Sequence, residues 1–222
     1  MFGWLKLKNE AVNEVVRRFE TVPAPTSDAL VYDCRFLVID IETTGLDAKN
    51  DHIVSIGWLP VLQQEINLAL GRHYLIKPPV SVGQSAVFHG LHDKDLSQAR
   101  DLSEVLAELL ESYAGAVFVA HHASIEQKFL TLACQRLYGR SPKFKFIDTM
   151  QLEWQRLLNQ GKVVHQRDLR LPSCLSRHHL PQSQHHHALE DAFSCALLLL
   201  SQLKKSRDHQ MTLGELQALS RG

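Results

Sequence analysis

The run Phe36-Leu37-Val38-Ile39-Asp40-Ile41-Glu42 decides how this chain folds. Five of its seven residues are apolar, and three of them are β-branched. Such a nearly continuous apolar run is typical of a central strand that is buried on both faces. Side chains two residues apart on a strand point to the same face, so Asp40 and Glu42 share one. We therefore predict two carboxylates aimed together at the end of a buried strand.

Two carboxylates in such a place oppose each other's ionisation, because burial and like charge both disfavour the charged form. A divalent cation that bridges them removes this penalty, and oxygen-only ligands suit Mg²⁺ or Mn²⁺ rather than Zn²⁺. The pattern alone also fits two solvated carboxylates at a strand end. The next residues, Thr43 to Leu46, offer hydroxyls, a glycine and an apolar side chain. This set suits either the binding of a nucleotide or an ordinary turn.

The hydrophobic pattern on either side of this run predicts alternating strands and helices. We expect further strands at 53–62, 72–77, 116–120 and 144–147, and helices at 85–89, 101–113, 124–137 and 189–203. After Asp148 the pattern indicates only helices. This order predicts an α/β domain with a mixed five-stranded sheet flanked by helices.

The two ends of the chain differ from the middle. An apolar stripe at helical spacing (Val12, Val15, Val16 and Phe19) is followed by a break at residues 22–27. We expect three parts: a helical arm and linker at 1–30, the α/β domain at 31–206 and a helical tail at 207–222. The stripe fits either packing on this domain or contact with a protein partner or a second copy of the chain.

Composition excludes several classes of protein. The 222 residues are 45% hydrophobic and 22% charged, which is typical of a soluble globular chain. The longest apolar run, 195–200, is far shorter than the roughly 20 residues of a membrane span. We find no secretory signal. The four cysteines are widely spaced, which indicates free thiols in a reducing compartment, and we expect a cytoplasmic protein. The absence of an H-E-x-x-H motif or clustered Cys/His ligands disfavours a zinc hydrolase.

Charge is balanced overall but unevenly distributed. Residues 31–126 hold 13 acids and 6 bases, whereas residues 127–180 hold 10 bases and 3 acids. The first segment is suited to collect cations and the second to meet phosphates, although the two also fit internal pairing. The bases that we expect to contact a nucleic-acid backbone, or else to form a solvated helix face, are Lys128, Arg136, Arg140, Lys143, Lys145 and Arg156.

Two further groups of polar residues follow the acidic pair. In the first, residues 121–126 connect a strand to a helix, with Ser124 expected as the N-cap and Glu126 in the first turn. In the second, His186 precedes Asp191 by five residues, which on a helix leaves them about 140° apart. We therefore expect His186 in a loop and Asp191 in the first turns of the next helix. The alternatives are that Asp191 compensates the helix dipole and that the histidine tract is solvated or binds metal adventitiously.

Taken together and in this order, these segments resemble the DnaQ-like DEDDh exonucleases, typified by the proofreading subunit of bacterial DNA polymerase III and by ribonuclease T. Residues 38–46 (VIDIETTGL) resemble the first motif of that family, and residues 119–126 (VAHHASIE) resemble the second. Residues 186–192 (HHALEDA) resemble the third. Shorter similarities are found at 88–91, 147–149 and 171–181. The resemblance extends over about residues 34–203.

The resemblance implies an RNase-H-like fold and 3′→5′ hydrolysis of single-stranded DNA or RNA with release of nucleoside monophosphates. It implies that two Mg²⁺ or Mn²⁺ ions are held by Asp40, Glu42, Glu126 and Asp191. It assigns to His186 the removal of a proton from the attacking water, a role suited to a pKa near 6.5. The residues implied to bind the terminal nucleotide are Thr43, Thr44, Gly45, Leu46 and His89, and we add His122, which lies beside the site.

The sequence departs from the family pattern at two positions. Glu126 stands where the family has aspartate, and the extra methylene moves the carboxylate by roughly 1–1.5 Å. His122 replaces an asparagine, adding a ligand or a positive charge. A misplacement of about 1 Å can cost about 10²-fold in rate. The alternative to an active exonuclease is therefore a catalytically weakened module that binds nucleic-acid ends or serves as a scaffold.

Overall fold

The computed structural model describes residues 14–79, 96, 99–182, 187–205 and 210–221. The helix expected at 85–89 lies outside the described residues, and so do the candidate site residues His89 and His186. In the described part of the chain, we find no helix with both the length and the apolar character that crossing a membrane requires.

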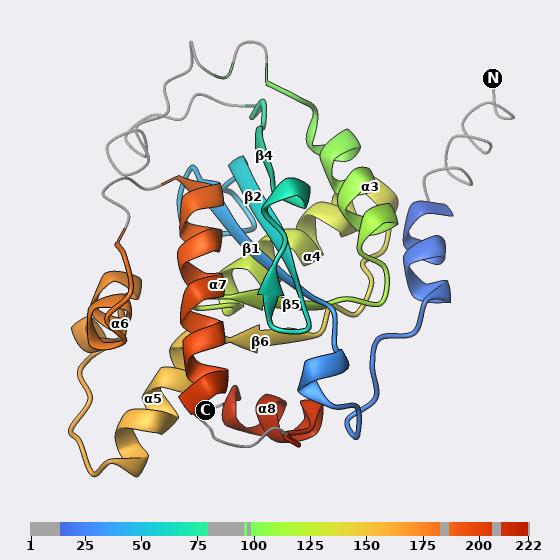
Figure 1. Cartoon of the computed structure of the whole chain (residues 1–222). Helices are drawn as coiled ribbons and strands as arrows, with labels where there is room; N and C mark the ends of the chain where they lie inside the picture. Colours follow the sequence, from blue (N-terminus) through green and yellow to red (C-terminus); the bar gives the residue numbers. More distant parts are fainter. Residues whose placement is uncertain (1–13, 80–95, 97–98, 183–186, 206–209, 222) are drawn as a thin grey trace, which may run out of the picture.

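The centre of the fold is a mixed sheet (Figure 1). Its strands are β1 (Phe36–Thr43), β2 (Ile53–Leu62), β3 (Glu65–Ile66), β4 (Arg72–Leu75), β5 (Val117–Ala120) and β6 (Phe146–Asp148). They lie in the order β3-β2-β1-β5-β6, and β4 also pairs with β2. Strand β1 runs antiparallel to β2 and parallel to β5. The predicted RNase-H-like α/β class is confirmed, and the strand beyond the expected five is β3, which at two residues is too short for a periodic signal.

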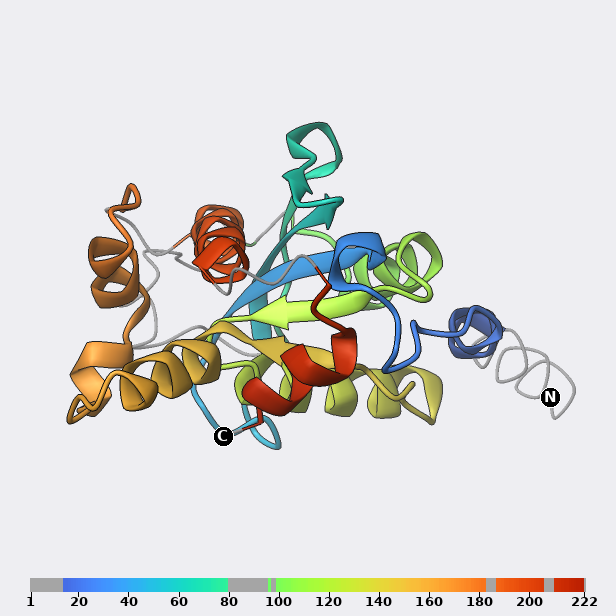
Figure 2. The same cartoon turned by 60° about the horizontal axis from the view of Figure 1, so that its bottom comes forward.

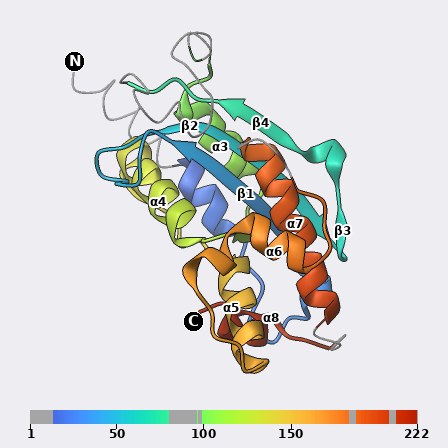
Figure 3. The ribbon, with the colours of Figure 1, turned by 90° about the vertical axis from the view of Figure 1, so that its left-hand side faces the viewer.

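Helices cover both faces of the sheet. The α-helices are α3 (Leu102–Ser112), α4 (Ser124–Tyr138), α5 (Thr149–Asn159), α6 (Leu171–Arg177), α7 (Ala188–Lys205) and α8 (Leu213–Leu219). Short 3₁₀ turns are η1 (Val31–Asp33), η2 (Leu68–Leu70) and η4 (Gln166–Leu169). Figure 3 shows α5, α6 and α7 on the same side of the molecule. The three helices that the periodicity predicted at 101–113, 124–137 and 189–203 correspond to α3, α4 and α7.

The alternation of side chains along β1 decides what its acids face. Leu37, Ile39 and Ile41 are buried in the core that also includes side chains of α3 and α4. Phe36 and Val38 are buried in the opposite core, together with side chains of α5, α7 and α8. Asp40 and Glu42 continue this second face of the strand. The two carboxylates therefore lie on the side of the sheet that α7 covers.

Helix α7 approaches the sheet most tightly at a glycine. Gly57 of β2 pairs with Asp40, and a Cβ atom added to it would lie 2.3 Å from the backbone nitrogen of Leu189. Three small residues of α7 are fully buried: Ala188, Ala192 and Ala196. Their four-residue spacing places them on one face of the helix. The start of α7 is thus held directly over the strand pair that carries Asp40.

The ends of the described chain pack against the sheet domain. In the helix at 14–21, Val16 and Phe19 are buried, and the Phe19 ring lies 5.8 Å from that of Phe144, centroid to centroid. In α8, Leu213 and Leu216 are buried in the core beneath α7. Val16 and Phe19, which belong to the N-terminal apolar stripe, therefore pack against this chain itself. Figure 2 shows the helix at 14–21 (blue) beside the sheet and the segment from β3 to β4 (teal) projecting from it. The domain boundaries at 30 and 206 remain predictions.

Substituting Gly57→Ala should destabilise the fold, because the added methyl group meets backbone atoms of α7, which cannot move aside as a side chain can. Overpacking of this kind costs about 1–3 kcal/mol, which corresponds to a fall of several degrees in Tm for a chain of this size. Thermal unfolding followed by circular dichroism measures the shift. Gly71→Ala, where the nearest atom would lie at 3.1 Å, is the milder control. Equal Tm values for Gly57→Ala and the unmodified chain would contradict this account.

Candidate metal and active site

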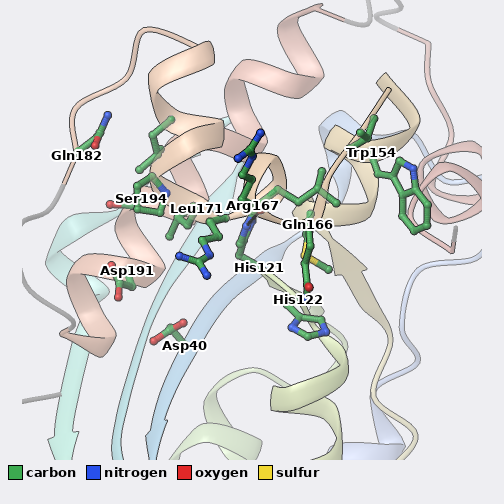
Figure 4. A pocket seen from close by; sticks show the side chains of 16 residues that line it. Asp40, His121, His122, Trp154, Gln166, Arg167, Leu171, Gln182, Asp191 and Ser194 are labelled. Atoms are coloured by element: carbon green, nitrogen blue, oxygen red, sulfur yellow. Dashed lines mark hydrogen bonds between the residues drawn. The ribbon is translucent and has the colours of Figure 1, made fainter. Parts of the chain in front are cut away.

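Three acidic side chains converge at the point where β1 meets the start of α7. Asp40 and Glu42 come from β1, and Asp191 comes from the first turn of α7, where its amide donates to the carbonyl of His187 over 2.9 Å. One carboxylate oxygen from each of the three lies within 4.8 Å of the others. Figure 4 shows Asp40 and Asp191 close together at one end of a pocket. Residues about 150 positions apart in the sequence thus share one site.

The environment of these acids opposes their ionisation. Burial, followed by the charges of Glu126, Glu42 and Asp191, raises the pKa of Asp40 well above its ordinary value. Burial and the charge of Asp191 raise the pKa of Glu42 to about 7. Clustered carboxylates with such raised pKa values need a positive charge if all are to ionise at neutral pH. Their donor set consists only of oxygen, which fits a hard divalent cation.

Glu126 is the most deeply buried of the four candidate acids, with 4% of its surface exposed. It lies in the first turn of α4, and its Oε2 atom has no hydrogen-bond partner within the part of the chain that the structure describes. Burial, together with the charges of Asp148 and Glu42, raises its pKa to about 8, although a backbone hydrogen bond opposes this shift. Glu126 is not part of the group of three whose oxygens lie within 4.8 Å of one another. An orphaned carboxylate oxygen beside other acids nevertheless fits a site built to receive a cation.

Asp148 fixes the turn that carries Glu126. Its carboxylate accepts hydrogen bonds from the amides of His122 (2.9 Å), Ala123 (3.0 Å) and Met150 (2.9 Å). The first two belong to the turn before α4, and the third belongs to α5. The prediction that Ser124 caps α4 is wrong, because the helix begins at Ser124 and the acceptor comes from the neighbouring strand β6. His122 adopts a left-handed φ of 73°, a conformation that asparagine and histidine tolerate better than most residues.

His121 is held by hydrogen bonds at both ring nitrogens. Its Nε2 lies 2.7 Å from the carbonyl oxygen of Leu169, and its Nδ1 lies 2.9 Å from the hydroxyl of Thr149. A carbonyl only accepts, so Nε2 carries the proton and Nδ1 accepts from the hydroxyl. Burial lowers the pKa of His121, so the ring is neutral at neutral pH. This histidine ties the acidic site to the η4 turn rather than serving as a proton acceptor.

The loop after Glu42 is shaped by its own polar groups. The Thr43 hydroxyl donates to the carbonyl of Gly45 over 2.6 Å, and the Thr44 hydroxyl donates to Asp51 over 3.0 Å. A Cβ atom at Gly45 would lie 2.4 Å from the Asp51 carboxylate, so this position requires glycine unless Asp51 moves. Leu46 projects from the loop with 81% of its surface exposed. The loop therefore presents backbone and an apolar side chain beside the acids.

A pocket of about 1160 Å³ begins at the acids and extends away from them over α5, η4 and α6. Figure 4 shows Trp154 at the opposite end from Asp191, with Arg167 between them in this view. The lining residues are Asp40, His121, His122, Met150, Trp154, Val164, Gln166, Arg167, Leu169, Arg170, Leu171, Pro172, Leu175, Gln182, Asp191 and Ser194. The site is thus open to a ligand larger than one small molecule.

Most of the basic residues that the sequence singled out are engaged elsewhere. Arg136 donates to the carbonyls of Ala48 and Lys49, and Arg140 pairs with Glu20. Lys145 donates to the carbonyl of Pro25, and Arg156 pairs with Glu153. These four bases contact other residues of this chain, and none of them lines the pocket that contains Asp40. That they contact a nucleic acid stays a prediction. The arginines that line the pocket are instead Arg167 and Arg170. Sequence reasoning missed them because they lie in a short irregular segment with no periodicity.

A mixed sheet with carboxylates gathered at the end of its first strand, beside an elongated pocket, defines the class of RNase-H-like nucleases. The family model described as "Exonuclease" (RNase_T) matches residues 37–199. The chain therefore belongs to this exonuclease family. Among curated relatives, it is 31% identical over 176 residues to the PolC-type DNA polymerase III of Thermotoga maritima and 30% identical over 174 residues to that of Thermotoga petrophila. These alignments include 79% and 78% of this chain but only 12% of either polymerase.

Solved structures share the fold. Exonuclease X in complex with 5′ overhanging duplex DNA superposes with a TM-score of 0.60 at 20% identity, over 82% of this chain and 98% of that one. E. coli exonuclease I in complex with a dT13 oligonucleotide gives 0.65 at 13% identity, over 79% and 42%. The nuclease domain of 3′hExo, a DEDDh family member bound to rAMP, gives 0.63 at 15% identity, over 80% and 95%.

The raised pKa values predict that the stability of the metal-free chain falls as pH rises. In the folded chain the pKa of Glu42 is raised to about 7 and that of Glu126 to about 8, from an ordinary value of 4.5. Between about pH 4.5 and pH 8 the folded state binds more protons than the unfolded one, so the free energy of unfolding decreases through this window. Since a tenfold change in proton affinity is worth about 1.4 kcal/mol, the loss should reach a few kcal/mol. Added Mg²⁺ or Mn²⁺ should raise Tm more at pH 8 than at pH 5.

Thermal unfolding in EDTA and in Mg²⁺ across this pH range measures the effect. The double variant Glu42→Gln, Glu126→Gln should flatten the pH dependence and reduce the gain from metal. Asp28→Asn, an exposed acid outside the site, is the matched control and should behave as the unmodified chain. The same metal-induced rise in Tm at pH 5 and pH 8 would speak against a cation held by these acids.

Proposed function

We propose that this chain is a metal-dependent 3′→5′ exonuclease that removes nucleoside monophosphates from the 3′ end of single-stranded DNA or RNA. The observation that carries the proposal is the meeting of Asp40, Glu42 and Asp191 within 4.8 Å, in a chain that belongs to the exonuclease family. The buried Glu126 beside them supports it.

In this proposal, Asp40, Glu42, Asp191 and Glu126 hold two Mg²⁺ or Mn²⁺ ions. Bound divalent cations supply neutralisation of phosphate charge, activation of water and stabilisation of the leaving oxygen. The chain's own groups hold the site in place and move a proton. Asp148 and His121 fix the turn before α4 through their hydrogen bonds. His186 takes the proton from the attacking water, a role that we carry over from the motif.

The terminal nucleotide is proposed to bind against residues 43–46, together with His89 and His122. Leu46, largely exposed next to the acids, offers an apolar surface to a base. Gly45 offers its backbone to the nucleotide and has no side chain of its own, and the Asp51 carboxylate fills the space where a Cβ would lie. His122 lines the same pocket as Asp40. The PolC-type relatives are DNA polymerases, which favours DNA over RNA as the substrate.

Hydrolysis of end-labelled oligonucleotides tests the proposal. With Mg²⁺ and a 5′-labelled single strand, the unmodified chain should give a ladder that shortens from the 3′ end, and matched DNA and RNA strands should rank the two substrates. Asp40→Asn and Asp191→Asn should each lower the rate by about 10³-fold or more, because each removes a charge that the two-metal arrangement needs. EDTA should abolish the reaction. Asp28→Asn is again the control, and undiminished hydrolysis by the double variant Asp40→Asn, Asp191→Asn would refute the proposal.

The second candidate function is a weakened module that binds ends without efficient cleavage. The position of Glu126 outside the group of three favours this candidate, because the longer side chain can hold its carboxylate at the wrong distance. In that case Glu126→Asp should raise the rate constant by about 10²-fold, the factor that roughly 1 Å of misplacement can cost. Single-turnover kinetics in Mg²⁺ and in Mn²⁺ measure it. A lower rate for Glu126→Asp would mean that the chain has adapted to glutamate and would exclude this candidate.

A further inference from the structure

The pocket continues well past the groups that the proposed reaction requires. Only Asp40, Asp191 and the neighbouring His121 and His122 belong to the acidic end, and the remaining lining comes from α5, η4, α6, the segments flanking η4 and α6, and Ser194 of α7. A site for one small molecule measures roughly 300–1,000 Å³, and this pocket of about 1160 Å³ exceeds that range. The pocket therefore has room for more than a terminal nucleotide.

Two arginines give this extension a positive charge. Arg167 and Arg170 are both exposed and both line the pocket. Arg167 approaches the carboxylate of Asp168 only to 4.0 Å, with 81% of its own side chain exposed. Among the described residues, Arg170 forms no salt bridge. Free guanidinium groups along a groove are suited to phosphate oxygens, which they contact without regard to base sequence.

An aromatic ring lies at the far end. Trp154 of α5 is 38% exposed and lines the same pocket, whereas Trp58 is fully buried in the core. Figure 4 shows the indole beyond Arg167 and Gln166 as seen from the acids. An exposed aromatic side chain beside a positively charged groove is the arrangement on which single-stranded nucleic acids stack their bases. Leu171 and Pro172 add apolar side chains to the lining of the same pocket.

The wall that carries the arginines is anchored to the rest of the protein. The Leu169 carbonyl accepts from His121, and the Asp168 carbonyl accepts from Arg177. Arg177 in turn pairs with Glu153, whose side chain is fully buried and also contacts Arg156 and His178. Burial alone would raise the pKa of Glu153, but hydrogen bonds from these three partners outweigh it and hold the pKa well below its ordinary value. The groove is therefore preformed relative to the acids.

We propose that Arg167, Arg170 and Trp154 form a binding track for the nucleotides that precede the 3′ end of a single strand, with the two arginines on backbone phosphates and the indole stacked on a base. This inference rests on the proposed function, because the track gives the direction in which the bound strand extends away from the acidic site. It assigns to these three residues strand binding and no part in the hydrolysis itself.

Binding and hydrolysis measured on two substrates test the track. The first is a 5′-labelled oligonucleotide of about 12 nucleotides, within the range one such groove holds. The second is the p-nitrophenyl ester of thymidine 5′-phosphate, which has no preceding nucleotides. The double variant Arg167→Ala, Arg170→Ala should raise KM for the oligonucleotide and leave hydrolysis of the ester unchanged. In chains that also carry Asp191→Asn, the slope of log Kd against log salt concentration should be smaller by about 1.4 for the double arginine variant. This is about 0.7 for each phosphate contact that is lost.

Trp154→Ala should weaken oligonucleotide binding by about fivefold or more, whereas Trp154→Phe, which keeps a ring, should stay near the unmodified value. The matched control for charge is Arg17→Ala, Lys204→Ala, which removes two exposed bases outside the pocket lining. An equal loss of affinity in this control, or an equal loss of ester hydrolysis in the arginine variant, would overturn the track. If the unmodified chain hydrolyses neither substrate, the proposed function fails, while the salt slope still decides whether the track exists.

Discussion

Mutual repulsion among buried carboxylates is the constraint on which the rest of this structure depends. Asp40, Glu42 and Asp191 lie within 4.8 Å of one another, and burial and like charge raise the pKa of both strand acids. Such a cluster persists only because the packing of α7 on the sheet forces it. At Gly57, the backbone of α7 occupies the space that a side chain would fill. Burial of apolar side chains elsewhere in the same core stabilises this packing and so offsets the repulsion among the carboxylates.

Hydrogen bonds around the acids fix the segments that surround them. Asp148 fixes the turn that leads to Glu126, and His121 joins that turn to η4. The η4 turn is also held by Arg177, part of the buried charged cluster around Glu153. Removing one partner from such a cluster is costly, since it leaves a buried charge uncompensated. The acidic site and the basic groove beside it are thus fixed relative to each other by the same few hydrogen bonds.

Similarity to known proteins supports this assembly at two levels. The family match spans residues 37–199, which includes β1, β5 and most of α7 and therefore all four candidate acids. The three solved exonucleases named above share the fold at 13–20% sequence identity. The alignments include only 12% of the PolC-type polymerases, so the similarity is limited to a small part of those proteins. The helix at 14–21 and α8 lie outside the matched region yet pack into the same cores.

The sequence by itself determined the class of fold, the strand that carries Asp40 and Glu42, and the helix that carries Asp191. These follow from local hydrophobic periodicity and from the two-residue repeat of a strand, which are written into neighbouring residues. Only the tertiary structure decided that Gly57 admits α7, that Asp148 rather than Ser124 satisfies the turn before α4, and that Arg167 and Arg170 line the pocket while Arg136 and Arg140 do not. Each of these depends on contacts between segments distant in the chain, and no local pattern encodes which surfaces will meet.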